Sequence, residues 1–446
     1  MKNYAIAFII AVAIVVAVIA VAVLPAFVLH ELSNRCDEYR FRISIPQRLD
    51  TFPDDVRIVQ LGIEGHSLAL DENGDVWAWG SNWFGRLGVG DDFDNQYIPL
   101  NISRLENSPL NGVVVKQIST DAHSLALDED GNVWVWGLNL QGQLGTGECR
   151  EYSHERLPVN ISDSFGSARI AQVFAGFSSS LALDENGHVW AWGSGEDGRL
   201  GIGNDQQQRY PVNVSVKANS PLANVEIVQI SVGFSHALAL DAEGKVWAWG
   251  SNDRGQLGTG ERVIPHVCPP GTIAPNHYRP VNISTLSESE LEGVRIVQVS
   301  AGTAHSLALD EEGNVWAWGN GCWGRIGTEN QVQKYSPVNI SSTEDSNLNG
   351  VDIVSVEADR DAIAIDSDGN VWMWGKDWYG ELGMERHEGG ADLSFPTNVS
   401  AMPDFIFYNV AIAQAQEGWM LLSKDGDIYV WGYARYGRLG VGDIFK

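Results

Sequence analysis

Apolar and polar residues alternate in short runs along most of this chain, and Gly-rich turns separate the runs. In one copy of the pattern, Ser67–Leu70 and Val76–Trp79 are β-rich, and the turn Asp71–Gly74 joins them. Two β-rich runs joined by a short Asn-Gly turn predict an antiparallel hairpin. Because side chains on a strand repeat every second residue, Trp77 and Trp79 share one face, where large rings suit packing between sheets.

The returning strand of this hairpin reads Val-Trp-x-Trp-Gly, and the phrase occurs seven times, with a degraded last copy at Ile428–Gly432. The closing glycines follow one another by 57, 56, 57, 69, 56 and 57 residues. They are Gly80, Gly137, Gly193, Gly250, Gly319, Gly375 and Gly432. A fixed period in the tens of residues indicates stacked units, none of which can bury its apolar face alone.

Each unit also contains an earlier β-rich run, such as Arg57–Leu61, and a later extended segment, such as Pro158–Ser162. Four short strands with Gly-rich turns are the composition of one propeller blade. We therefore predict an all-β fold, a seven-bladed β-propeller over residues 39–446. An open β-solenoid is the alternative.

The chain ends favour a closed ring over the solenoid. Phe41–Pro46 precedes Ile58 by the spacing that Pro211–Ser215 keeps before Ile227, so it reads as an outer strand without a blade of its own. The last unit, which contains Trp431, lacks such a strand. Sharing one blade between the two termini would close the ring and leave no exposed pair of strand edges.

Two further motifs identify a family. Gly233-Phe234-Ser235-His236 leads into Leu238-Ala239-Leu240, and Gly250-Ser251-Asn252 leads into Gly255-Gln256-Leu257-Gly258. With the Trp phrase, these residues resemble the RCC1 (regulator of chromosome condensation) repeat family over about residues 40–446. The resemblance implies a seven-bladed propeller. It implies function only weakly, because members include a nuclear exchange factor for a small GTPase, a secreted β-lactamase inhibitor and modules of signalling proteins.

The N-terminal segment Ala5–Leu29 contains no charged residue, and its 25 positions are enough to cross a bilayer. We expect one transmembrane helix that acts as an uncleaved signal anchor, with residues 1–38 as anchor and short linker. A cleaved signal peptide, which would give a secreted protein, is the alternative. Lys2 before the segment and Glu31 after it place the propeller on the extracytoplasmic side.

The formal net charge of the chain is −28, and its pI is about 4.6. A strongly acidic protein repels phosphate backbones, so we expect no nucleic-acid partner. We expect a monomer that binds an unidentified protein.

Six copies of the repeat carry an Asn-x-Ser tripeptide, which is an N-glycosylation acceptor sequence on an extracytoplasmic domain. The alternative is that the tripeptide is a copied strand-edge feature without sugar. The six residues are Asn101, Asn160, Asn213, Asn282, Asn339 and Asn398.

The four cysteines are Cys36, Cys149, Cys268 and Cys322. An even number in an extracytoplasmic chain permits disulfides, but the sequence alone does not choose the connectivity. Cys268 lies in the one long insertion, Glu261–Arg279, which leads into the blade that holds Cys322. We choose a Cys268–Cys322 bridge, with free thiols as the alternative.

Candidate chemistry is sparse. His66, His123, His236 and His305 recur at one repeat position, one per blade, which places them far apart, so we interpret them as structural and not as metal ligands. The Asp-rich hairpin turns lack the spaced ligands of a calcium loop. No phosphate-binding Gly loop, nucleophile elbow or zinc-protease motif occurs. We therefore expect no catalytic residue, cofactor or metal, and no enzyme.

One departure from repetition points to binding. The residue before the Gly of the Gly-x-Leu-Gly turn is aromatic in copies one, five, six and seven, which are neighbours in a closed ring. Aromatic residues are enriched in protein-binding hot spots. The alternative is that the rings pack on their own loops. The predicted partner-binding residues are Trp83, Phe84, Trp323, Trp378, Tyr379, Tyr433 and Tyr436.

Together these features predict a membrane-tethered, extracytoplasmic propeller that acts as a non-enzymatic protein-interaction scaffold. One rival is a guanine-nucleotide exchange factor, by family analogy. A second is a carbohydrate- or envelope-directed enzyme, which would need convergent carboxylates in the central pocket.

Overall fold

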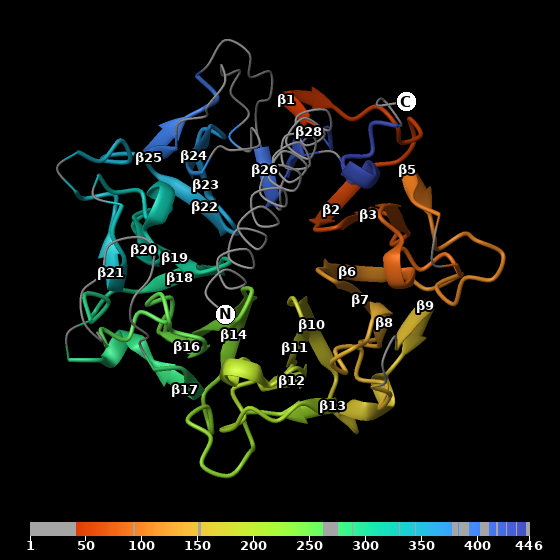
Figure 1. The fold of residues 1–446 in the computed structure, drawn as a ribbon, viewed down its shortest axis with the longest axis horizontal. Helices are drawn as coiled ribbons and strands as arrows, with labels where there is room; N and C mark the ends of the chain where they lie inside the picture. The colour runs from red at the N-terminus through yellow and green to blue at the C-terminus, as the bar shows by residue number, and fades with distance from the viewer. Residues whose placement is uncertain are drawn as a thin grey trace, which may run out of the picture. The chain divides into compact units, whose positions relative to one another are not determined.

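Seven four-stranded sheets stand around a common centre, and each sheet holds one copy of the sequence repeat (Figure 1). The computed structural model describes residues 42–91, 94–149, 153–261, 275–287, 289–329, 331–343, 345–376, 382, 392–401, 410–415, 418–424, 426–433 and 435–442. The unit that spans Ile43–Ile444 forms the ring. The predicted seven-bladed propeller is confirmed.

The first three blades have the following strands. Blade one contains β2 Ile58–Ile63, β3 His66–Asp71, β4 Val76–Gly80 and β5 Gln96–Asn101. Blade two contains β6 Val115–Thr120, β7 His123–Asp128, β8 Val133–Leu138 and β9 His154–Asn160. Blade three contains β10 Ile170–Ala175, β11 Ser179–Asp184, β12 Val189–Gly193 and β13 Gln208–Asn213.

The next three blades follow the same order. Blade four contains β14 Ile227–Val232, β15 His236–Asp241, β16 Val246–Gly250 and β17 His277–Asn282. Blade five contains β18 Ile296–Ala301, β19 His305–Asp310, β20 Val315–Gly319 and β21 Lys334–Asn339. Blade six contains β22 Ile353–Ala358, β23 Ala362–Asp366, β24 Val371–Gly375 and β25 Leu393–Asn398. The short 3-10 turns are η1 Trp83–Gly85, η2 Ser162–Phe165, η3 Glu196–Gly198, η4 Ile283–Thr285, η5 Cys322–Gly324 and η6 Arg435–Gly437.

The seventh blade joins the two ends of the ring. Its strands are β26 Val410–Ala415, β27 Gly418–Ser423, β28 Ile428–Tyr433 and, outermost, β1 Arg42–Arg48. Just beyond β1, the Leu49 amide donates to the Ile428 carbonyl at 2.7 Å. The outer strand expected from the sequence spacing therefore pairs with β28, as the matched spacing predicts, and covers its edge.

The predicted membrane segment, residues 5–29, lies outside the described residues. Among the residues that are described, no helix is long and apolar enough to cross a membrane.

The first Trp of each repeat is held by the Asp that begins the hairpin turn. Asp71 Oδ1 accepts the amides of Asn73 and Asp75 at 2.9 and 3.0 Å, and Oδ2 accepts the indole N–H of Trp77 at 2.9 Å. The same Asp–Trp bond joins Asp128–Trp134, Asp184–Trp190, Asp241–Trp247, Asp310–Trp316 and Asp366–Trp372. One carboxylate thus satisfies both the turn and the ring, which explains the recurrence of this turn in the sequence.

The second Trp of each repeat joins neighbouring blades. The fully buried Trp136 donates its indole N–H to the Arg86 carbonyl of blade one at 2.8 Å. Equivalent bonds are Trp79–Arg438, Trp192–Gln143, Trp249–Arg199, Trp318–Gln256 and Trp374–Arg325. The six turns that supply these carbonyl groups are therefore inter-blade contacts as well as loops.

Three of the four repeated histidines also bridge blades, in agreement with their structural interpretation. His66 Nε2 lies 2.7 Å from Ser124 Oγ of the next blade, and His123–Ser180 and His236–Ser306 repeat the contact at 2.6 and 2.9 Å. Burial lowers the pKa of His123 to about 3, so these imidazoles are neutral.

Candidate binding face

Each side of the ring presents a different set of turns. On one side, here called the loop face, lie the crossings from the first to the second strand and the loops after the Trp-Gly phrase. Ser194 of such a loop donates its amide to the carbonyl of Ser178 in the crossing, at 2.9 Å, and Ser251 does the same to Ser235. The opposite side, the hairpin face, carries the Asp turns and the ends of the outer strands.

Three of the predicted aromatic residues have an unusual backbone. Phe84, Trp323 and Tyr436 have φ values of 60, 60 and 59°, in the left-handed region, and Asp197 has 58°. Bulky residues avoid this region, at a cost on the order of 1 kcal/mol. The four lie in η1, η3, η5 and η6.

The conformation correlates with the residue after the turn's first Gly in the six described turns. Blades with left-handed residues have Arg there: Arg86, Arg199, Arg325 and Arg438. Blades two and four have Gln143 and Gln256 instead, and each Gln side chain accepts the amide two residues earlier, that of Gln141 or Arg254, at 2.8 Å. Neither Gln141 nor Arg254 has a positive φ.

The aromatic side chains on this face differ in exposure. Trp83 is 61% exposed and Tyr436 is 37% exposed, whereas Phe84 and Trp323 are half-buried. The ring of Trp323 lies 4.6 Å from the Arg325 guanidinium carbon, and Phe84 meets His154 of the next blade edge-on at 6.0 Å. The loop face therefore combines rings that pack on their own surroundings with rings that reach solvent.

The remaining predicted binding residues are not placed. Trp378 and Tyr379 lie outside the described residues. Tyr433 ends β28, but its side chain is outside the description as well.

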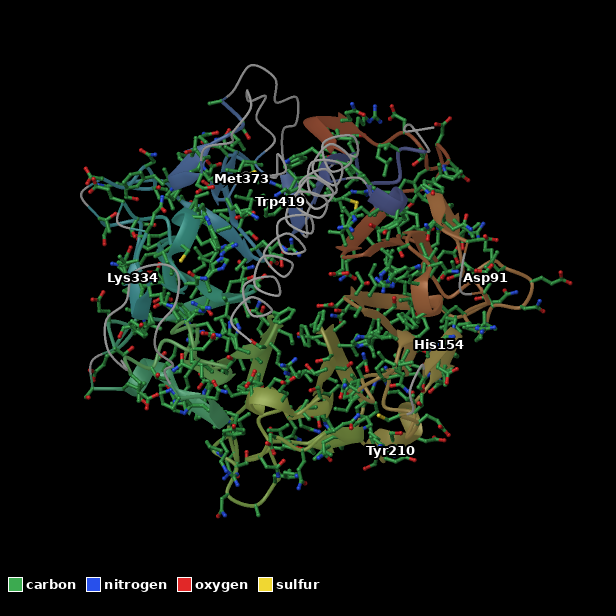
Figure 2. The ribbon with its side chains drawn as sticks, in the orientation of Figure 1. Asp91, His154, Tyr210, Lys334, Met373 and Trp419 are labelled. Atoms are coloured by element: carbon green, nitrogen blue, oxygen red, sulfur yellow. The ribbon has the colours of Figure 1, made fainter. Side chains whose placement is uncertain are left out.

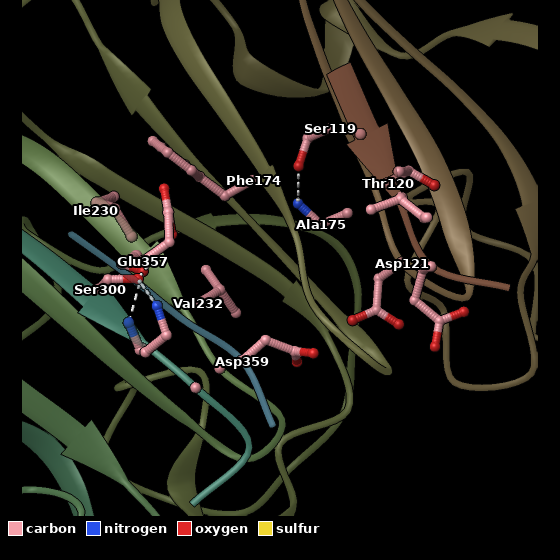
Figure 3. Close-up of a pocket in the computed structure, with 18 of the residues that line it drawn as sticks. Ser119, Thr120, Asp121, Phe174, Ala175, Ile230, Val232, Ser300, Glu357 and Asp359 are labelled. Carbon is pink, nitrogen blue, oxygen red and sulfur yellow. Dashed lines mark hydrogen bonds between the residues drawn. The ribbon is translucent and has the colours of Figure 1, made fainter. Parts of the chain in front are cut away.

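At the centre of the loop face the innermost strands surround a cavity of about 300 Å³. Gln side chains join these strands: Gln60 donates to the Ile118 carbonyl and accepts the Ile118 amide, both at 2.9 Å, and Gln117 repeats both bonds to Val173. Ser119 Oγ accepts the Ala175 amide at 2.8 Å (Figure 3). The walls of the channel are thus fixed by side-chain bonds between blades.

Carboxylates occupy part of the rim of this cavity. Glu64 and Asp121 stand in the crossings after β2 and β6, Asp359 follows β22, and Glu357 lies on β22; all four line the cavity. Asp121 and Asp359 project into one space from the crossings of different blades (Figure 3). We call Glu64, Asp121 and Asp359 the acidic rim.

The acidic rim is electrostatically crowded. Burial raises the pKa of Asp359 to about 7, and neighbouring Glu64 adds to the rise despite Arg360 and Arg325 nearby. Burial, together with Glu64 and Asp359, raises the pKa of Asp121 well above its usual value, while Arg86 opposes the rise. Burial also raises the pKa of Glu357 to about 7, although Ser300 donates a hydrogen bond to it. Burial, whose effect exceeds that of any neighbouring charge, is therefore the main reason that these carboxyl groups hold their protons more tightly than usual.

Across the cavity the rim is aromatic. Blades three and four cross from first to second strand through Gly176-Phe177-Ser178 and Gly233-Phe234-Ser235. The two rings lie 4.5 Å apart and are each 45% exposed. Phe234 lines the cavity and Phe177 packs against it. One half of the mouth is therefore acidic and the other apolar.

Sequence reasoning missed this mouth. The signal was the residue that stands two positions before the second strand of each blade. It is Phe177 or Phe234 in blades three and four, but Glu64 or Asp121 in blades one and two. A comparison of that position among copies would have found the asymmetry. The carboxylates that the enzyme hypothesis required do converge here, but the described residues contain no group of three His, Cys, Asp or Glu side chains arranged to hold a metal.

The six predicted glycosylation residues end the outer strands on the hairpin face. Asn101 pairs with Trp77 across the sheet, its Oδ1 accepts the Arg104 amide, and Ser103 Oγ of the same tripeptide accepts the Val76 amide at 2.9 Å. The equivalent serines bond Val133, Val189, Val246, Val315 and Val371. The Asn and the Ser of the tripeptide therefore both make hydrogen bonds within the fold. Glycosylation of the six asparagines stays a prediction.

Cys322 is disulfide-bonded and Cys149 is free. Cys268 lies outside the described residues, so the Cys268–Cys322 pairing stays a prediction.

Comparisons with known proteins agree with this architecture. A family model described as the RCC1-like domain matches residues 104–445, and models of the RCC1 repeat match residues 73–127 and 59–86. The mitochondrial RCC1 domain-containing protein RUG3 of Arabidopsis thaliana is 29% identical over 352 residues, which cover 78% of this chain and 72% of RUG3. The ultraviolet-B receptor UVR8 of the same plant is 29% identical over 340 residues, 76% of this chain and 68% of UVR8. The crystal structure of human WBSCR16 matches with a TM-score of 0.67 at 25% identity and covers 87% of this chain and 88% of WBSCR16.

Proposed function

Because this chain belongs to the RCC1-like domain family, whose propellers generally serve as binding or exchange modules, we propose that it is a non-enzymatic scaffold whose loop face binds a protein. The observation that carries the proposal is the placement of Phe84, Trp323 and Tyr436 at left-handed positions. Gly, Asn or Asp would suit such a backbone better, as Asp197 illustrates in blade three. A bulky ring in this strained conformation is better explained by a partner than by the backbone.

The exposure of Trp83 and Tyr436 supports the same proposal. Large aromatic side chains that remain in solvent lose the benefit of burial, and in protein interfaces they are the residues that contribute most to affinity. Arg86, which donates to the Trp83 carbonyl at 3.0 Å, fixes the loop from which Trp83 projects. The aromatic loops are therefore held in place before a partner arrives, which lowers the entropic cost of binding.

We further propose that the scaffold is tethered to a membrane through residues 5–29, with the propeller on the extracytoplasmic side. The uncharged length of that segment and the charges on either side of it support this placement. Sedimentation of the full chain with membranes that persists in alkaline carbonate is expected, and protease added to intact cells should digest the propeller. Recovery of a soluble chain that begins near residue 30 would indicate a cleaved signal peptide instead.

The binding proposal is tested by partner capture with full-length variants. Trp83→Ala with Tyr436→Ala should reduce capture by about tenfold or more if these rings are hot spots. Tyr210→Ala is the matched control, because Tyr210 is 58% exposed but lies at the outer edge of the ring (Figure 2). Equal capture by all three proteins would refute a loop-face scaffold.

Guanine-nucleotide exchange is the alternative activity within this family. It requires a propeller on the cytoplasmic or nuclear side. Protease protection in intact cells, together with faster nucleotide release from a small GTPase on addition of the full chain, would replace the scaffold proposal with this one.

A further inference from the structure

We propose that the mouth of the central cavity recognises the partner. This channel mouth is formed by the acidic rim together with Phe177 and Phe234, and it takes a lysine or arginine side chain from a basic protein segment. The inference rests on the proposed scaffold function and names the chemistry of its partner. The cation would lie among Glu64, Asp121 and Asp359, and the apolar part of the segment would cover Phe234 and Phe177.

Charge complementarity is the first support. Three carboxyl groups from three different blades line one cavity. Glu64 raises the pKa of both Asp121 and Asp359, and Asp359 also raises the pKa of Asp121. Arg86, Arg325 and Arg360 lie near them, yet the pKa values of Asp121 and Asp359 remain raised. A cation placed among these carboxyl groups would favour their ionised form, so its binding would release protons and become tighter as pH rises, and the net charge of −28 would speed the approach of a basic partner.

The aromatic pair is the second and independent support. Nothing in the blade packing requires Phe177 and Phe234 to be exposed, since Thr303 occupies the corresponding crossing of blade five. Exposed rings beside a pocket favour the aliphatic stem of a Lys or Arg side chain and can hold its cation over the ring face. The acidic rim thus suits the cationic end of a Lys or Arg side chain, and the two phenylalanines suit its aliphatic stem.

The size of the site limits the occupant. A cavity of about 300 Å³ stands at the small end of ligand pockets, which fits one inserted side chain and not a folded domain. Its walls are fixed by the Gln60 and Gln117 bonds between blades, so the site exists before binding. The absence of a grouped metal site among the described residues favours an organic cation over a coordinated metal ion.

The test is a titration of the full chain, kept in solution by a non-ionic detergent, with a fluorescent peptide that has Arg-Lys-Arg at its centre and Gly and Ser around it. The comparison peptide replaces the three basic residues with citrulline and norleucine. We expect the basic peptide to bind and the neutral one to bind at least about tenfold more weakly. Equal binding of both peptides would overturn the proposal.

Matched variants locate the binding. Asp121→Asn with Asp359→Asn should weaken the basic peptide by about tenfold or more. Glu129→Gln with Glu312→Gln removes the same charge from exposed positions of the hairpin face and should have little effect. An equal loss in both pairs would mean non-specific attraction and overturn the site. Displacement of the peptide by millimolar calcium at constant ionic strength would also overturn it, in favour of an inorganic cation site.

A second variant keeps the test decisive if the Asp replacements impair folding. Phe177→Ala with Phe234→Ala leaves the charge unchanged, alters exposed side chains, and should weaken the basic peptide several-fold. Unchanged binding would contradict the aromatic half of the site. If these variants retain both peptide and partner while Trp83→Ala loses the partner, only the present inference fails; if no loop-face variant affects the partner, the scaffold proposal fails.

Discussion

The hairpin face repeats its side-chain contacts from blade to blade, whereas the loop face changes them. On the hairpin face, one Asp bonds one Trp in six blades, with distances of 2.8 to 3.0 Å. On the loop face, one crossing position holds carboxylates in blades one, two and six and phenylalanines in blades three and four. Every blade packs against its neighbours in the same way, so the residues that recur in all blades are explained by this packing. The residues that differ between blades are not required for packing and are available for binding.

The two faces are distinct only in a closed ring, and β1 completes the blade that closes it. Removal of β1 should therefore have the largest effect on stability. Deletion of residues 39–48 should lower the free energy of unfolding on the order of 5 kcal/mol, because it removes the buried Ile43 and exposes the edge of β28. Urea denaturation of the deletion variant and the full chain measures the difference. An unchanged midpoint would mean that the ring does not depend on this closure.

Two aspartates then compare the faces directly. Asp310→Ala, on the hairpin face, should cost about 3 kcal/mol, because it leaves the buried Trp316 indole and the amides of Glu312 and Asn314 without their acceptor. Asp359→Asn, on the loop face, should be neutral or slightly stabilising. Chemical denaturation checks both, and equal losses would remove the distinction between the faces.

The channel carboxyls predict an unusual dependence on pH. Asp359 and Glu357 have folded pKa values of about 7, above their unfolded values, so the folded state holds extra protons and their contribution to stability is lost as pH rises through 7. Relative to Glu357→Gln with Asp359→Asn, whose side chains do not titrate, the wild type should lose about 2 kcal/mol or more of stability between about pH 4 and pH 8, with most of the loss complete once the pH has passed about 7. The buried histidines act oppositely, because their lowered pKa values destabilise the fold as pH falls below about 6.5, and they cancel in this difference. A wild type that gains stability over the variant as pH rises would contradict the burial of these carboxyls.

The smallest effect concerns backbone strain on the loop face. Phe84→Gly should raise stability by up to about 1 kcal/mol because Gly accepts the left-handed backbone at Phe84. The matched change Gln141→Gly, where φ is not positive, should lower stability by a similar amount. Thermal unfolding of the two variants measures the sign, and a loss of stability in Phe84→Gly would mean that the ring is part of the core.

The fold was predictable because its determinants recur. Seven copies of Trp77-like and Trp79-like residues at one spacing require one packing arrangement, and the orphan strand near Phe41 could be assigned from spacing alone. The channel mouth was not predictable by the same reasoning. Glu64, Asp121 and Asp359 are far apart in the chain, stand in crossings without a motif, and meet only because the ring closes. The left-handed loops depend on whether Arg86 or Gln143 follows the turn glycine, which no propensity scale expresses.

Hydrogen–deuterium exchange of the full chain, with and without the Arg-Lys-Arg peptide at saturation, tests the central claim most directly. Slower exchange is expected in the crossings at 63–66, 120–123 and 232–236, which border the channel mouth. Exchange in the hairpin turns at 71–75 and 310–314 should not change. Protection confined to the hairpin turns or the outer strands, or protection nowhere, would contradict the assignment of binding to the loop face.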